Sequence, residues 1–340
     1  MMDRRTLLAG GLSGLALAGC TPGRSVDAAG GLGVEIRDSA ARRVLHPGMR
    51  PQVLSSGYIW SEGPAWDERR QCLYFTDVPG NTAYRWSEPT GTQVWQQPSG
   101  IAAQEAVGMR EAGLNGLWCN AQGELWGCNH GRRRVERIDP ETGERTALVE
   151  RFDGQAFNSP NDLAISSAGA IYFTDPPYGL EGLDASPLKE MSVNGVYRLD
   201  PDGHCVRLID DMTFPNGIGL SPDERWLYVA QSDPDAPVIR RFRLDAEGGV
   251  SGGEVWVDAR DALAAGEQGL PDGMSVLPNG WVFATAPGGV SLLSEAGDVL
   301  ARIRTASATA NCTLGEDGGA LFITAHDRLL RLELRREGVR

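Results

Sequence analysis

An internal repeat constrains the fold of this chain more than any other feature of the sequence. The tetrapeptide YFTD at residues 74–77 recurs unchanged at residues 172–175. Four further apolar segments follow turns rich in Gly, Asp and Asn in the same way, and they begin at Glu124, Trp226, Trp281 and Leu321. Short strand-like segments joined by such turns predict β-hairpins. Six units of about 40–55 residues, each holding hairpins, predict an all-β fold, a six-bladed β-propeller with a central channel.

The two ends of the predicted propeller are expected to meet. The last unit, which ends near Leu334, is short, and a strand-like segment at residues 33–44 precedes the first full unit. We expect this segment to add a strand to the last blade, because that pairing would cover two exposed sheet edges. Helical periodicity is nearly absent, and residues 258–267 are the best candidate for a short helix. The propeller is predicted to span residues 34–340.

Composition and charge exclude several classes of function. The formal net charge of −13 argues against nucleic acid as a partner. Lys189 is the only lysine, so no phosphate-binding loop of the GxxxxGK[ST] type can form. The four histidines show no HExxH spacing; they are His46, His130, His204 and His326. The five cysteines after Cys20 are odd in number and form no CxxC pair, which argues against a disulfide framework or a zinc ribbon.

The N-terminus has the features of an export signal. Arg4 and Arg5 precede an apolar stretch that is too short to span a bilayer permanently, which predicts a signal peptide at residues 1–19. The arginine pair resembles a twin-arginine signal, with an ordinary secretory signal as the alternative. The sequence LAGC, which ends at Cys20, resembles a lipoprotein cleavage site, so a lipid on Cys20 would be the chain's only membrane contact. Residues 20–33 are predicted to be a flexible tether.

These signals predict an exported protein that is periplasmic or tethered to a membrane. The residue after the lipid-bearing cysteine is Thr21 and not the aspartate that favours retention in the inner membrane. We therefore expect the outer membrane if the source is Gram-negative. The sequence carries no sign of an oligomeric state.

The residue that opens each hairpin carries a side-chain oxygen in all six units. The spacing to the first aliphatic residue of the next strand is constant within one position, as from Glu62 to Leu73 and from Asn161 to Ile171. The six residues are Glu62, Asn115, Asn161, Asn216, Asp272 and Asn311. Asn-Gly and Asp-Gly pairs often form turns, but six in phase predict a ring, because the first strand of every blade lines the axis of a propeller.

A ring of carboxylates and amides, without nitrogen or sulfur donors, suits a hard cation such as Ca²⁺. We predict a site made by Glu62, Asn161, Asn216 and Asp272 and completed by water or substrate. Asp162, beside Asn161, is a candidate for holding a ligand in place, with a turn residue as the alternative.

The units around these residues resemble the SMP-30/gluconolactonase/LRE-like family of six-bladed propellers. The matching segments include SEGPAW, FNSPNDL, FPNGIGL and LPDGMSV. The resemblance implies hydrolysis of a lactone, with a small-molecule sugar lactone such as gluconolactone as substrate, and metal ligands at the same four positions. It also implies that Asn115 contacts the substrate, and that some members work with Mg²⁺, Mn²⁺ or Zn²⁺ in place of Ca²⁺. The mammalian branch has an arginine close before this asparagine, whereas here Arg110 lies five positions away.

The resemblance also suggests the chemistry. A bound Ca²⁺ would polarise a lactone carbonyl, and Asp272 would act as base or nucleophile in addition to being a ligand, or only as a ligand. No GxSxG motif occurs, which argues against a serine hydrolase. Two alternatives keep the scaffold: a phosphotriesterase or other esterase, and a non-catalytic binding propeller with a structural calcium. The long insertion at residues 176–194 is expected to be either a lid or a plain surface loop.

Overall fold

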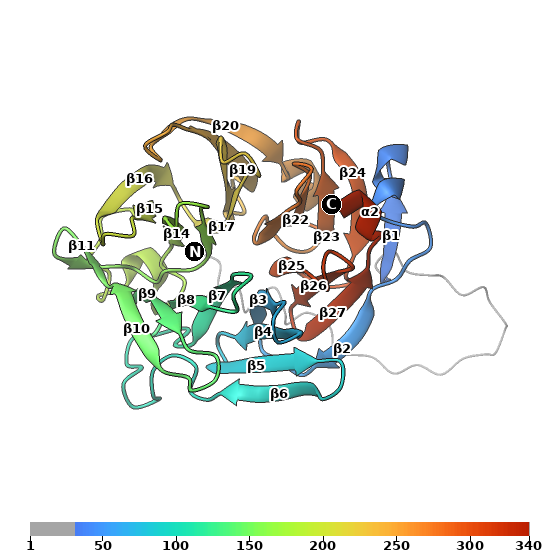
Figure 1. Cartoon of the computed structure of the whole chain (residues 1–340). Helices are drawn as coiled ribbons and strands as arrows, with labels where there is room; N and C mark the ends of the chain where they lie inside the picture. Colours follow the sequence, from blue (N-terminus) through green and yellow to red (C-terminus); the bar gives the residue numbers. More distant parts are fainter. Residues whose placement is uncertain (1–30, 340) are drawn as a thin grey trace, which may run out of the picture.

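Six antiparallel sheets stand around a common axis in the computed structural model, which describes residues 31–339 (Figure 1). The predicted all-β six-bladed propeller is confirmed. The predicted signal peptide, residues 1–19, lies outside the described residues, as does most of the predicted tether at residues 20–33. In the part of the chain that the structure describes, no helix is long and apolar enough to cross a membrane.

Each of the first four blades consists of four strands that follow one another along the chain. Blades one and two contain β3 (Ser61–Asp67), β4 (Cys72–Asp77), β5 (Thr82–Ser87) and β6 (Gly91–Gln96), then β7 (Leu114–Cys119), β8 (Leu125–Asn129), β9 (Arg134–Ile138) and β10 (Arg145–Val149). Blades three and four contain β13 (Leu163–Ile165), β14 (Ile171–Asp175), β15 (Asn194–Leu199) and β16 (Cys205–Met212), then β17 (Pro215–Leu220), β18 (Trp226–Gln231), β19 (Val238–Leu244) and β20 (Val250–Asp258).

The last two blades take strands from both ends of the chain. Blade five contains β21 (Met274–Val276), β22 (Val282–Ala286), β23 (Gly289–Leu293), β24 (Val299–Arg304) and β1 (Gly33–Ile36). Blade six contains β25 (Asn311–Gly315), β26 (Ala320–Ala325), β27 (Arg328–Glu333) and β2 (Gln52–Ser56). The remaining elements are the hairpin β11 (Arg151–Phe152) and β12 (Gln155–Ala156), 3-10 turns at Ser39–Arg43 and Leu183–Ala185, and the short helices α1 (Arg260–Ala264) and α2 (Arg336–Val339).

The prediction that residues 33–44 complete the last blade is wrong in its strand assignment. Strand β1 pairs with β24 of blade five, and β2, further along the chain, pairs with β27 of blade six. The segment between them cannot be a strand because it turns inward and packs into the core of these two blades through Ala41, Val44 and Leu45, all 0% exposed. The principle of closure by the N-terminal segment holds, and two strands of that segment cover the outer edges of two blades in place of one.

The repeated YFTD segment explains how one blade packs against two neighbours. Side chains alternate across a strand, so Tyr74 joins the apolar cluster shared with blade two while Phe75 joins the cluster shared with blade six. In blade three, Tyr172 packs toward blade four and Phe173 toward blade two. The two identical segments therefore make equivalent packing contacts, with the tyrosine toward the next blade and the phenylalanine toward the preceding one.

The aspartate that ends each YFTD segment fixes the backbone that leads into the first strand of its blade. The carboxylate of Asp77 accepts hydrogen bonds from the backbone N–H groups of residues 59 and 60, at 3.0 and 3.1 Å. Asp175 accepts the same pair of bonds from residues 158 and 159, both at 2.8 Å. Both aspartates thus fix the chain two and three residues before an oxygen-bearing residue at the start of a blade, Glu62 or Asn161.

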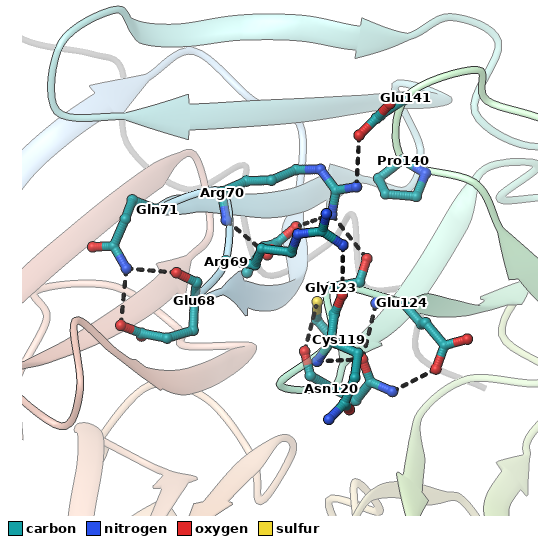
Figure 2. Close-up of polar contacts among 12 residues, drawn as sticks. Glu68, Arg69, Arg70, Gln71, Cys119, Asn120, Gly123, Glu124, Pro140 and Glu141 are labelled. Carbon is teal, nitrogen blue, oxygen red and sulfur yellow. Dashed lines mark hydrogen bonds and ion pairs between the residues drawn. The ribbon is translucent and has the colours of Figure 1, made fainter.

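The opposite ends of blades one and two are joined by an arginine, as Figure 2 shows. Arg70, in the turn after β3, lies against Asp67 at 2.7 Å, the carbonyl of Gly123 at 2.9 Å and Glu141 at 2.9 Å. Glu141 is exposed, so its share of this network contributes little to stability. The bonds to Asp67 and Gly123 tie the turn of one blade to that of the next, away from the oxygen-bearing ring.

Candidate functional site at the propeller axis

The six oxygen-bearing residues lie where the first strands of the six blades begin, and neighbouring blades bond to one another at this level. Hydroxyl groups of second strands donate to the backbone carbonyls of the next blade, Thr76 to Asn115 at 3.2 Å and Thr174 to Asn216 at 2.7 Å. The backbone of Gly116 donates to the carbonyl of Asn161 at 2.8 Å. Residues at the same position in each sequence unit therefore lie at the same height along the propeller axis. We call these six residues the ring.

In three blades, the ring residue lies beside an irregularity in strand pairing. The register between first and second strands shifts just after Glu62 in blade one, around Asn115 in blade two and around Asn216 in blade four. A β-bulge re-aims side chains and is common beside functional sites. The Glu-Gly and Asn-Gly pairs are thus bulges inside strands and not hairpin turns.

The glycines that follow ring residues allow neighbouring blades to approach closely. A Cβ atom on Gly217 would lie 2.1 Å from the carbonyl oxygen of Asp272, and one on Gly63 would lie 2.0 Å from that of Asn115. Neither contact is possible for a real side chain, so glycine is required by packing around the axis. Only Gly63 also has a positive φ, of 51°.

Asn216 offers an oxygen that nothing in the described residues uses. Its side-chain nitrogen donates to Ser232 Oγ at 2.8 Å, whereas its Oδ1 is buried and has no hydrogen-bond partner among residues 31–339. A buried unsatisfied carbonyl is costly and requires an explanation. A bound cation would supply one, because an amide oxygen is a ligand for Ca²⁺ and similar ions.

Glu62 is the most buried carboxylate of the ring, with 3% of its surface exposed. Burial raises its pKa to about 8, with further contributions from the nearby charges of Asp162 and Glu111. The backbone N–H of Gly63 donates to Glu62 Oε2 at 3.0 Å. A carboxylate in such surroundings gains from a cation partner. Glu62 and Asn216 therefore fit a divalent ion.

Asp162, directly after Asn161, is a buried carboxylate with 7% of its surface exposed. It accepts hydrogen bonds from its own strand at Leu163, 2.9 Å away, and from Asn311 Nδ2 at 3.4 Å. Burial raises its pKa to about 6. Asn311 also accepts a bond from the backbone of Cys312 at 2.8 Å, so both ends of its amide are occupied. Asn311 belongs to the ring by its position in the repeat, and its amide nitrogen is directed at Asp162.

Asp272 is half-buried, and its backbone N–H donates to Thr285 Oγ1 at 3.0 Å. It is more open than Glu62, Asn161 and Asn216, which are 3 to 4% exposed. Of the four predicted ligands it is thus the most accessible to water and substrate. Within residues 31–339, no three His, Cys, Asp or Glu side chains come together to hold a metal ion. The two ring carboxylates would therefore share any ion with asparagine oxygens.

Two residues beside Asn115 were not selected from the sequence as members of the site. His130 Nε2 lies 3.2 Å from Asn115 Nδ2, and its Nδ1 lies 3.7 Å from Glu111 Oε2. His130 is 0% exposed, and burial, together with the nearby Arg110, lowers its pKa to about 3. The imidazole is therefore neutral. A lone histidine after an apolar strand gives no sequence signal that separates this position from an ordinary core position.

The insertion at residues 176–194 is a fixed rim. The carbonyl of Gly179 accepts a bond from the backbone of Arg110 at 2.8 Å, and its N–H donates to Ser159 Oγ at 2.9 Å. A Cβ on Gly179 would lie 3.0 Å from that of His130, so the loop rests directly on this histidine. The ring of Tyr178 stacks on Phe214 with centroids 5.7 Å apart. These bonds favour a preformed wall over a moving lid.

Fold and ring together define a six-bladed propeller with an oxygen-lined site at its axis. The chain belongs to the SMP-30/gluconolactonase/LRE-like family, since the sequence profile of that region matches residues 60–327. It is 40% identical to the gluconolactonase of Zymomonas mobilis over 291 residues, which cover 84% of this chain and 82% of the relative. It is 26% identical to the L-arabinolactonase of Azospirillum brasilense over 286 residues, covering 83% and 86% of the two chains.

The solved structure of a gluconolactonase from Xanthomonas campestris has the same fold. Its TM-score to this chain is 0.76 at 33% sequence identity, and the match covers 91% of this chain and 99% of that one. The resemblance inferred from the sequence is therefore confirmed.

Proposed function

We propose that this protein hydrolyses a lactone of a sugar acid with the help of a divalent ion, Ca²⁺ in the first place, held by Glu62, Asn161, Asn216 and Asp272. The buried, partnerless Oδ1 of Asn216 is the observation that carries the metal. The likeness over most of the chain to gluconolactonases and an arabinolactonase supports lactone hydrolysis and a carbohydrate substrate.

The reaction adds water to the lactone carbonyl and breaks the ring C–O bond, which yields the open hydroxy acid. The ion, when bound, would polarise the carbonyl and stabilise the oxygen that becomes negative. We assign the attacking water to Asp272, the most exposed of the four ligands, which would accept the proton and return it to the leaving alkoxide. Asn115 would hold the substrate through a neutral hydrogen bond.

Activity should disappear after exhaustive chelation and return when Ca²⁺ is added, with Mg²⁺, Mn²⁺ and Zn²⁺ as the comparison ions. Full activity of protein shown by elemental analysis to contain no metal would overturn the metal-dependent mechanism. A panel of gluconolactone, arabinonolactone, an aliphatic lactone and a paraoxon-type ester would separate the substrate classes. Turnover of only the phosphotriester would favour the esterase alternative. A fold that melts on chelation but turns over no substrate would favour a binding propeller with a structural ion.

We further propose that the protein is exported and anchored by a lipid on Cys20, which lies outside the described residues. The support is the sequence alone, through Arg4, Arg5 and the LAGC segment. In a Gram-negative source the destination would be the outer membrane.

A further inference from the structure

Three ring asparagines have side-chain amides that are held by hydrogen bonds to the protein: Asn115, Asn216 and Asn311. A side-chain amide has one oxygen and one NH₂ group on opposite sides. Whichever group is held by the protein, the other is presented in the opposite direction. For a cation only the oxygen is useful, so a ligand asparagine needs its NH₂ group held on the far side.

Ser232 holds the NH₂ group of Asn216. Ser232 Oγ lies 2.6 Å from the carbonyl oxygen of Pro271 and 2.8 Å from Asn216 Nδ2. The carbonyl can only accept, so the single hydroxyl proton goes to Pro271. Ser232 Oγ can then only accept from its other neighbour, which forces the NH₂ group of Asn216 toward it. Both residues are 4% exposed, so water does not compete for these bonds.

Asn115 has the same arrangement in blade two. The residue before it, Leu114, pairs with Asn129, and the residue before Asn216, Pro215, pairs with Gln231. His130 and Ser232 thus occupy equivalent positions, directly after the second strand. The His130 imidazole is neutral, so one of its two ring nitrogens can accept; with the proton on Nδ1, which is buried 3.7 Å from Glu111 Oε2, Nε2 accepts from the NH₂ group of Asn115 at 3.2 Å.

We propose that Ser232 is a positioning residue that turns the oxygen of Asn216 toward the bound ion, and that His130 turns the oxygen of Asn115 toward the substrate. The role of Ser232 rests on the proposed function, because it requires a bound ion. Asn311 supplies the contrast, because its Oδ1 accepts from the backbone of Cys312 and its Nδ2 donates to Asp162, so both ends of its amide already bond the protein. In blades two and four, the residue directly after the second strand thus orients the amide of the ring asparagine.

Calorimetric titration with Ca²⁺ of the full chain tests the role of Ser232. We expect Ser232→Ala to weaken Ca²⁺ binding about 10–100-fold, the usual cost of losing the partner of a metal ligand. Ser232→Thr keeps the hydroxyl and should restore affinity. Ser221→Ala is the matched control, since Ser221 is also in blade four and 5% exposed but bonds Asp223 and the backbone at the other end of the blade. It should leave affinity unchanged.

A second background separates positioning from a merely structural role. In Asn216→Asp the two side-chain oxygens are equivalent, so orientation no longer matters and adding Ser232→Ala should cost little or no affinity. Equal losses in both backgrounds, or no loss in Ser232→Ala, would overturn the proposal.

If wild-type protein binds no Ca²⁺, the proposed metal mechanism is refuted. The orientation of the amides can still be tested by a measurement on metal-free protein. In ¹⁵N-labelled metal-free protein, the side-chain NH₂ protons of Asn216 should exchange slowly with solvent in wild type and Ser232→Thr, and fast in Ser232→Ala. The same comparison on Asn115 in His130→Ala tests the second pair. Equal exchange rates would show that neither partner orients its amide.

Discussion

Asn311 of blade six donates a hydrogen bond to Asp162 of blade three, with 3.4 Å between Nδ2 and Oδ2. These blades face each other in a ring of six, so the bond crosses the propeller axis. Asp162 follows the predicted ligand Asn161 by one residue. The pair therefore joins two opposite blades across the axis at the level of the ring.

Asp272→Asn should separate ligand from base. The amide keeps one oxygen for the ion but cannot take a proton, so Ca²⁺ binding should weaken while kcat falls by about 10²–10⁴-fold at saturating Ca²⁺. Asn115→Ala is the comparison: it removes one neutral hydrogen bond of about 0.5–1.5 kcal/mol and should mainly raise KM. A normal kcat in Asp272→Asn at saturating Ca²⁺ would show that the residue is only a ligand.

Gly217→Ala should disturb the ring through packing alone. The new Cβ would meet the Asp272 carbonyl at 2.1 Å, so blades four and five must separate. We expect a loss of at least about 1–3 kcal/mol in the free energy of unfolding, measured by denaturant titration, and weaker Ca²⁺ binding. Gly33→Ala on β1 is the control, because its Cβ would meet nothing within 4 Å. An unchanged stability of Gly217→Ala would refute the packing argument.

His130 should make stability depend on pH in the acid range. Its folded-state pKa of about 3 lies below the ordinary value of 6.5, so the unfolded chain binds a proton that the folded chain refuses. The stability that the neutral ring provides is complete above pH 6.5 and is lost as the pH falls from 6.5 toward 3, by up to about 1.4 kcal/mol per pH unit.

The difference in unfolding free energy between wild type and His130→Gln, followed from pH 7 to pH 4, measures this contribution. The exposed His204, in a turn of blade three, gives the control variant His204→Gln, which removes a histidine outside the core. A flat difference for His130→Gln would mean that the histidine takes up its proton in the folded protein.

Cys20→Ser should convert a membrane-bound protein into a soluble exported one, because the lipid is its only predicted anchor. Fractionation with detergent partitioning of both forms measures the change. Identical partitioning of variant and wild type would contradict lipid attachment at this residue.

Much of the fold could be predicted because the blades are repeats. The tetrapeptide at residues 74–77 alternates tyrosine and phenylalanine across a strand, and both faces of a propeller blade are buried, so this pattern survives in two units. The closure was misassigned for a physical reason. Residues 33–44 resemble a strand, but only the pairing partners decide which edge a short strand joins, and those partners lie at residues 301–304.

The six ring residues could be predicted from their constant position in the repeats, whereas the residues that hydrogen-bond to their side chains could not. Constant spacing selects Glu62 and Asn216 because a side-chain oxygen recurs at one level of every unit. Ser232 and His130 differ in type and share only their place after a second strand. Their importance follows from hydrogen bonds to Asn216 and Asn115, and no pattern of single residues encodes such a pair.

The double closure by β1 and β2 bears on how the protein is made. Strand β2 begins at Gln52, whose partner is Arg331, so β2 has no strand to pair with until almost the whole chain has emerged. Contacts this distant in sequence form late and slowly. A signal at the N-terminus would therefore act while the ring is still open. A secretory route would carry this open chain across the membrane and leave closure to the far side, whereas a twin-arginine route would have to wait for residue 331.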